Sequence, residues 1–214
     1  LGDVYKRQAN YGSSMSPFYS VLAIWVGMTI LVSLVKVHVN DAECLKDARP
    51  HQLFWGRYLI FFLLSQLQVL VIVLGDLYLL KIQCLHPFAF WAVAALTGFT
   101  FSLLIYSLTI SFGDIGKALA VVIMVLQIAG SGGTYPIEAL PGFFRQAYIF
   151  FPFPYAINAM RECIGGMYHH DIFVYLAELS LFIVVALVIG LIIRKPFIRI
   201  MHFIEKRMED TQMM

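Results

Sequence analysis

Few residues in this sequence have the types and spacing that catalysis or metal binding requires. His169, His170 and Asp171 are metal-ligating types, but adjacent histidines at a helix entrance are usually solvated, so we expect no metal. Residues 113–117 (GDIGK) lack the spacing of the phosphate-binding GxxxxGK(S/T) loop. Without a Ser–His–Asp order or paired carboxylates, the sequence predicts no cofactor in this chain and no enzyme that acts alone.

The thiols give a similar result. The three cysteines include no CxxC pair, which indicates neither a zinc site nor a disulfide framework. A Cys84–Cys163 bridge stays open as an alternative, because both residues are expected on the same side of a membrane.

Polar side chains inside otherwise apolar stretches are the next candidates. Asp76 and Glu178 either lie at a wet membrane interface, or they line a path or pair with Arg161. Amide side chains in the same stretches are expected to hydrogen-bond between helices. They are Gln66, Gln68 and Gln127.

The amino-acid composition indicates whether the protein is surrounded by water or by lipid. Of 214 residues, 60% are hydrophobic and 13% charged, whereas a soluble domain carries about 25% charge and roughly 45–50% apolar residues. These values exclude a disordered chain, a nucleic-acid module and an ordinary soluble enzyme. The net charge of +2 implies no polyanionic partner. We therefore expect an all-α, polytopic membrane protein in contact with lipid.

Five stretches are apolar enough to cross a hydrocarbon layer of ~30 Å as helices. They are residues 18–37, 59–80, 88–112, 115–133 and 172–193. Residues 1–17 are interpreted as a leader that is partly artefactual, and residues 201–214 as a tail. The faces holding residues 36–57, Lys117 and the tail carry ten Lys and Arg, against five on the opposite faces. The positive-inside rule then places the C-terminus in the cytoplasm of a plasma-membrane protein and the N-terminus outside.

Residues 130–166 are too apolar for a solvated loop and too interrupted for one crossing. Glycines 130, 132 and 133 allow the fourth helix to stop, and prolines 136, 141, 152 and 154 divide the rest of the segment. We expect two short helices, one starting at Pro141 and ending near Phe151, the other running from Pro154 to Gly165. They form a hairpin over residues 135–166 that dips into the outer leaflet, or alternatively an aromatic loop at the interface.

Several strings in this region carry a resemblance to a known family. They are residues 116–119 (GKAL), 126–127 (LQ), 130–133 (GSGG), 135–136 (YP), 141–144 (PGFF) and 154–162 (PYAINAMRE). The chain resembles the C-terminal membrane domain of the YhgE/Pip family, within the clan of type 2 ABC exporter permeases. This resemblance implies a six-span fold that has lost its first span and a large extracytoplasmic insertion.

The resemblance also implies which residues act. A short cytoplasmic helix at residues 40–55 would touch an ATPase subunit, unless it is only a solvated connector. Its candidate contacts are Leu45, Lys46, Arg49, Phe54 and Trp55. The broken hairpin would be an outer gate. Its candidate residues are Gly130, Ser131, Gly132, Gly133, Pro136, Pro141, Phe144, Pro154, Tyr155, Asn158, Arg161 and Glu162.

The sequence and this resemblance support three functional hypotheses. The first is a permease subunit, paired as a homodimer, that moves an amphipathic or polymeric substrate using a separate ATPase. The second is a surface protein that anchors an extracytoplasmic domain used by phage or by a secretion apparatus. The third is an accessory subunit of a secretion machine.

Overall fold

The computed structural model describes residues 11–35, 50–133, 142–166 and 170–193, and its regular elements there are all helices. In chain order they are α2 (Tyr11–Leu34), α3 (Pro50–Leu74), η2 (Gly75–Leu79), α4 (Pro87–Phe112), α5 (Asp114–Gly130), α6 (Gly142–Ala147), η4 (Tyr148–Phe150), α7 (Phe153–Gly165), α8 (Asp171–Leu187) and η5 (Val188–Ile193). The all-α fold class predicted from the sequence is confirmed.

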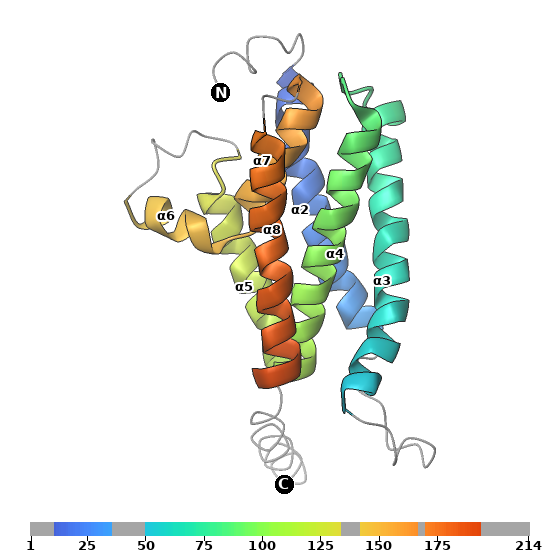
Figure 1. The fold of residues 1–214 in the computed structure, drawn as a ribbon, viewed down its shortest axis with the longest axis vertical. Helices are drawn as coiled ribbons and strands as arrows, with labels where there is room; N and C mark the ends of the chain where they lie inside the picture. Colours follow the sequence, from blue (N-terminus) through green and yellow to red (C-terminus); the bar gives the residue numbers. More distant parts are fainter. Residues whose placement is uncertain (1–10, 36–49, 134–141, 167–169, 194–214) are drawn as a thin grey trace, which may run out of the picture.

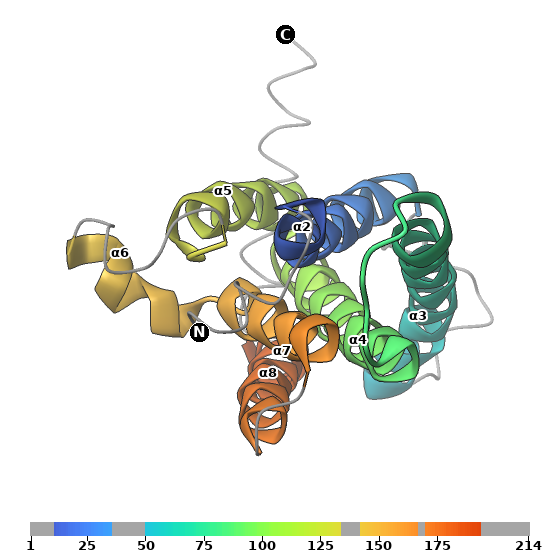
Figure 2. The same cartoon turned by 90° about the horizontal axis from the view of Figure 1, so that it is seen from above.

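Helix α4 is the centre of the bundle, and α2, α3, α5, α7 and α8 pack against it (Figures 1 and 2). Residues 100–111 of α4 are all buried. Several hydroxyls along α4 donate to the helix's own carbonyls, as Thr97 does to Val93 and Thr109 to Ile105. Such small, self-satisfied polar residues allow neighbouring helices to approach closely inside a membrane.

The helices give the bundle two distinct ends (Figure 1). The upper end holds residues 80–86 between η2 and α4, the end of α7 and the start of α8. The lower end holds the end of α2, the start of α3, the turn at Gly113 and the end of η5. Helix ends are grouped in this way when successive spans cross the membrane in alternate directions, as the sequence predicts.

Four helices are long and apolar enough to cross a membrane. They are Gly12–Leu34, Phe54–Leu79, Pro87–Phe112 and Asp171–Ile193. They match four of the five predicted spans. The fifth prediction, residues 115–133, corresponds to α5, which has 17 residues. Helix α5 is about 26 Å long at ~1.5 Å per residue, slightly short of a ~30 Å hydrocarbon layer. The predicted count of five crossings is therefore not established by helix length.

Helix α2 begins at Tyr11, inside the stretch predicted as a leader. Pro17 lies within it and cannot donate the backbone hydrogen bond that the Ser13 carbonyl would accept. The Ser16 hydroxyl donates to that carbonyl instead, over 3.2 Å. The Ser13 hydroxyl in turn accepts the Gln83 backbone N–H at 3.1 Å, which ties α2 to the loop at the upper end. These serines explain why the helix extends past the proline.

Two glycines let α3 approach its neighbours closely. A Cβ on Gly98 of α4 would lie 2.4 Å from Cγ2 of Val69, and one on Gly27 of α2 would overlap the amide of Gln68. Gln66, the other amide of α3, donates to the Ala95 carbonyl at 3.2 Å, as the interhelical prediction required. Gln68 contributes by packing over Gly27.

The Gly/Pro-rich segment forms the two predicted short helices. Helix α6 with η4 approaches the bundle from the side, and α7 then rises through it to the upper end (Figures 1 and 2). The two pieces meet at a bend, and the hairpin that dips into the outer leaflet stays a prediction. Their environments differ: α7 buries ten of its 13 residues against α2, α4 and α8, whereas Phe143, Ile149 and Phe150 on the first piece are exposed.

Candidate functional site

The start of α7 lies deep inside the bundle. The Phe153 ring is fully buried, 5.5 Å from the Trp25 ring and 5.4 Å from the Phe101 ring, measured between centroids. Trp25 and Phe101 themselves form an edge contact at 4.9 Å. Both lie near the midpoints of α2 and α4, so α7 starts about halfway along two membrane-length helices. A helix that begins this deep inside an apolar bundle needs protein groups to satisfy its backbone.

Gln127 of α5 provides the hydrogen-bond acceptor for the backbone at the start of α7. Phe153 stands between Pro152 and Pro154, neither of which has an N–H, so it carries the tripeptide's single backbone donor. That N–H donates to Gln127 Oε1 at 3.3 Å. Gln127 is fully buried, and its Nε2 has no acceptor among the described residues. The predicted interhelical role of Gln127 is thus confirmed, and its partner is the start of α7.

The aromatic cluster also fixes α5. Trp25 Nε1 donates to the Ala120 carbonyl at 3.2 Å. One side chain of α2 therefore touches α5, α4 and α7 together. Sequence reasoning did not identify Trp25, Phe101 and Phe153, because an aromatic residue in an apolar helix faces lipid as readily as protein.

The glycine break at the end of α5 is held by Arg161 of α7. Arg161 Nη2 donates to the Gly133 carbonyl at 2.9 Å, and Nη1 lies 3.4 Å from Asn158 Oδ1. Asn158 Nδ2 donates to the Tyr148 hydroxyl at 3.2 Å, which extends the network to η4. Arg161 is 9% exposed. The structure thus brings together Gly133, Asn158 and Arg161, three residues predicted for the gate.

The local backbone explains why glycine occupies this break. Gly132 has φ of 64°, in the left-handed region that favours glycine. A Cβ on Gly133 would lie 2.2 Å from the Phe18 ring of α2. The Ser131 hydroxyl accepts the Gly133 N–H at 3.3 Å, and Gly130 and Ser131 are buried. Residues 130–133 therefore pack closely against α2 and have no room for larger side chains at Gly133.

Other gate candidates lie along α7. The Tyr155 hydroxyl donates to the Ile149 carbonyl at 3.1 Å, and its ring contacts Phe182 of α8. Pro154 is buried at the start of the helix, and the Glu162 carbonyl accepts the capping N–H of Gly166 at 3.0 Å. Pro136 and Pro141, with the side chain of Phe144, lie outside the described residues.

The end of α7 is fastened to the loop at the upper end. The Cys163 carbonyl accepts the His86 N–H at 3.2 Å and the Cys84 thiol at 3.5 Å. Both cysteines are free thiols, so the alternative of a Cys84–Cys163 bridge does not describe this structure. Burial, reinforced by Cys84 and Glu162 nearby, raises the pKa of the Cys163 thiol to about 12.

Asp76 and Glu178 have different surroundings. Asp76 is buried in η2 at the upper end, where the Ser20 hydroxyl contacts its carboxyl group. This position matches the predicted outer end of the helix, but the carboxyl group is not at a wet surface. Glu178 is half-buried on α8.

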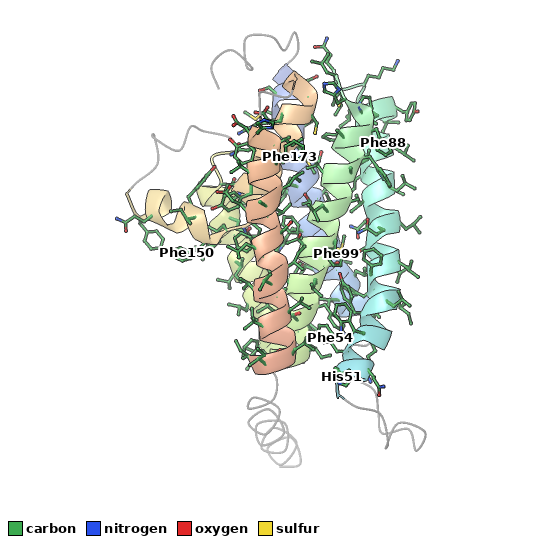
Figure 3. The ribbon with its side chains drawn as sticks, in the orientation of Figure 1. His51, Phe54, Phe88, Phe99, Phe150 and Phe173 are labelled. Atoms are coloured by element: carbon green, nitrogen blue, oxygen red, sulfur yellow. The ribbon has the colours of Figure 1, made fainter. Side chains whose placement is uncertain are left out.

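At the lower end, aromatic side chains close the bundle. Phe54 is fully buried and stacks edge-on against Tyr106, whose hydroxyl donates to the Phe54 carbonyl at 3.0 Å. Trp55 is 44% exposed, so of these two coupling candidates only Trp55 presents its ring at the surface. His51 and Phe54 mark this end in Figure 3. The candidates Leu45, Lys46 and Arg49 lie outside the described residues, and α3 has already begun at Pro50.

The described residues offer no alternative chemistry at either end. No three His, Cys, Asp or Glu side chains gather there as a metal site would require. The ion pair found in the described ranges, Lys117 Nζ to Asp114 Oδ1 at 2.8 Å, lies at the lower end and is largely exposed. The main feature of the site is α7, a helix about half the length of a span. Gln127 binds its start, and its own Arg161 links its side to the Gly133 carbonyl.

Comparison with known proteins gives two matches. The sequence model of a family described as "ABC-2 family transporter protein" matches residues 3–192. The protein YhgE of Bacillus subtilis (strain 168), described as uncharacterized, is 27% identical over 169 residues, which are 77% of this chain and 21% of YhgE. The chain thus spans about a fifth of the length of that relative. No solved structure matches.

Proposed function

The chain belongs to the ABC-2 family of transporter proteins, and from this membership we propose that it is the permease part of an exporter driven by a separate ATP-binding subunit. As a family member with four membrane-length helices, it is a multi-pass membrane protein and a component of membrane transport. The observation that carries the finer proposal is α7, a half-length helix that starts at mid-depth beside Phe101. Broken helices at this depth are tolerated where protein or a path for substrate covers them.

We propose that movement of α7 opens that path. The contacts of α7 are of two kinds, an extensive aromatic packing at its start and individual polar links along its side. The aromatic packing of Phe153 is extensive, whereas the polar links from Arg161 to Gly133 and from Asn158 to Tyr148 are single hydrogen bonds. A neutral hydrogen bond contributes about 0.5–1.5 kcal/mol net and one from a charged group such as Arg161 about 1.5–3 kcal/mol, so breaking either link costs less than withdrawing the aromatic ring, at about 3–5 kcal/mol.

The proposed substrate is amphipathic or polymeric. The side of α5 away from α4 exposes a row of apolar residues, among them Leu119, Val122 and Val125. The α6–η4 arm projects beside it with Phe150 78% exposed (Figure 3). An apolar surface open to the side suits a molecule that enters from lipid. The same surface suits contact with a second copy, so we propose a homodimer in which two α5 helices flank a shared path.

The ATP-binding subunit is proposed to act at the lower end. Trp55 offers an exposed ring there, the preceding residues Lys46 and Arg49 supply charge, and the buried ring of Phe54 connects this end to α4. Force applied at the start of α3 would reach the core through that ring.

The test is ATPase stimulation. The full-length protein is reconstituted with candidate ATP-binding subunits, and we expect one of them to form a stable complex with raised ATPase activity. Trp55→Ala should abolish the stimulation. Trp91→Ala is the matched control, because Trp91 is similarly exposed at the upper end of α4. Failure of every candidate subunit to bind or respond would contradict the proposal, as would equal activity of the two variants.

A further inference from the structure

Asp76 is a buried carboxyl group in a membrane-length helix. It is 6% exposed and lies in η2, the π-helical turn that ends α3 at the upper end. Carboxyl groups within such helices are costly when charged, and π-helical turns recur at functional sites. The protonation state of this group can be argued from its hydrogen bonds.

The Ser20 hydroxyl has two oxygen neighbours and one hydrogen to donate. Its Oγ lies 2.5 Å from Asp76 Oδ2 and 2.8 Å from the Ser16 carbonyl oxygen. If Asp76 were ionised, the single hydroxyl hydrogen of Ser20 would have to serve both short contacts. A protonated Asp76 supplies the missing hydrogen, and both contacts then become hydrogen bonds.

The surroundings offer no countercharge. Within the described residues, no ion pair reaches Asp76, and α2 and α4 contain no charged side chain there. Lys81, on the loop that follows, is exposed, and Arg161 of α7 is bonded to Gly133 and Asn158. The other titratable groups on the described elements at this end are Tyr19, Tyr78, Cys84, His86, Glu162, Cys163, His170 and Asp171.

We infer that Asp76 is a proton-binding site that joins α3 to α2 in the closed bundle. The carboxylic acid donates to Ser20, and Ser20 donates to the Ser16 carbonyl. The bound ligand is a proton taken from solvent at the upper end, where the group keeps its small exposure. This site goes beyond the transport proposal and does not depend on it.

The site has a conformational consequence. Separation of η2 from α2 would admit water to the carboxyl group, and an aspartic acid in water ionises at neutral pH. The proton is therefore retained in the packed state and released when the two helices part. Opening at the upper end and release of one proton are the same event.

Infrared spectroscopy of the full-length protein in lipid nanodiscs tests this inference. At neutral pH we expect the carbonyl stretch of a protonated carboxylic acid in the wild type, and its loss in Asp76→Asn. Asn keeps the shape and can still donate to Ser20. Asp114→Asn is the control, because Asp114 is exposed and paired with Lys117, and it should leave the band unchanged.

A second variant keeps the test decisive if Asp76→Asn does not fold. Ser20→Ala retains the carboxyl group but removes its hydrogen-bond partner, so the band should remain and shift in frequency. A wild-type spectrum without the band, a band that survives Asp76→Asn, or a band whose frequency Ser20→Ala leaves unchanged would each overturn the inference.

Discussion

Gln127 is the side chain on which the buried start of α7 depends. Its Oε1 accepts the Phe153 N–H, which has no neighbouring backbone donor to share the site. We expect Gln127→Leu to loosen this turn by about 1 kcal/mol, the net value of one hydrogen bond, and so to speed hydrogen exchange at the Phe153 amide roughly fivefold. Exchange measured by mass spectrometry checks this. Gln146→Leu, at an exposed position of α6, should change nothing there; equal effects of the two variants would contradict the assignment.

Two glycines in helical segments should respond to alanine with opposite signs. A Cβ on Gly190 of η5 would lie 2.6 Å from the Phe54 ring and 2.7 Å from Ser107 Oγ, whereas one on Gly56 of α3 meets nothing within 4 Å. Gly190→Ala should lower the free energy of unfolding by about 1–3 kcal/mol through overpacking. Gly56→Ala should raise it by about 0.5–1 kcal/mol through helix propensity. Thermal unfolding in detergent measures both, and two shifts of the same sign would refute the packing account.

Cys163 gives a pH dependence of known direction. Its carbonyl accepts the His86 N–H at the upper end, and burial raises the pKa of its thiol from the usual 9.0 to about 12. An acid whose pKa is raised on folding stabilises the fold below its unfolded pKa and loses that contribution as pH rises towards the folded value. The stability difference between the wild type and Cys163→Ala should therefore shrink between pH 9.0 and about 12. Parallel stability curves across this range would show that the thiol does not titrate in this way.

At the scale of elements, α6–η4 and α7 are neighbours in sequence with opposite environments. Phe153 at the start of α7 is fully buried, whereas Phe150 at the end of η4 is 78% exposed. Phe153→Ala should cost about 3–5 kcal/mol, as for a core phenylalanine, while Phe150→Ala should change stability by less than about 0.5 kcal/mol. Chemical unfolding of the two variants under the same conditions measures the contrast. A comparable loss in both would mean that α7 is not the anchored piece.

The positions of these elements could largely be predicted from the sequence, but their packing could not. Prolines and glycines restrict the backbone locally, so the pieces that became α6 and α7 were evident near Pro141 and Pro154. Which helix lies at the centre was not evident, because α4 and α8 are both long apolar stretches and only contacts distinguish them. The start of α2 at Tyr11 was not predicted, because residues 11–17 are less apolar than the predicted span and the Ser13 and Ser16 hydroxyls that support the helix there act through tertiary and local hydrogen bonds. Arg161 was found as a candidate, but its partner Gly133 depends on tertiary packing.

At the scale of the whole molecule, the two ends of the bundle differ in what they expose. Residues 80–86 lie at the upper end and η5 reaches the lower end (Figure 1). The stretches that lead from the lower end carry most of the Lys and Arg, which is the pattern of cytoplasmic segments. We therefore predict that the lower end faces the cytoplasm in the full-length protein.

Reporter fusions test this orientation. Green fluorescent protein joined at the C-terminus should fluoresce, and alkaline phosphatase joined there should be inactive, because the phosphatase needs an oxidising compartment to form its disulfides. Phosphatase inserted after Gln83, in the loop at the upper end, should be active. The reverse pattern would place Trp55 outside the cell, where no ATP-binding subunit could reach it. Since the bundle has no symmetry that exchanges its ends, this one measurement decides whether α7 opens toward the exterior or toward the cytoplasm.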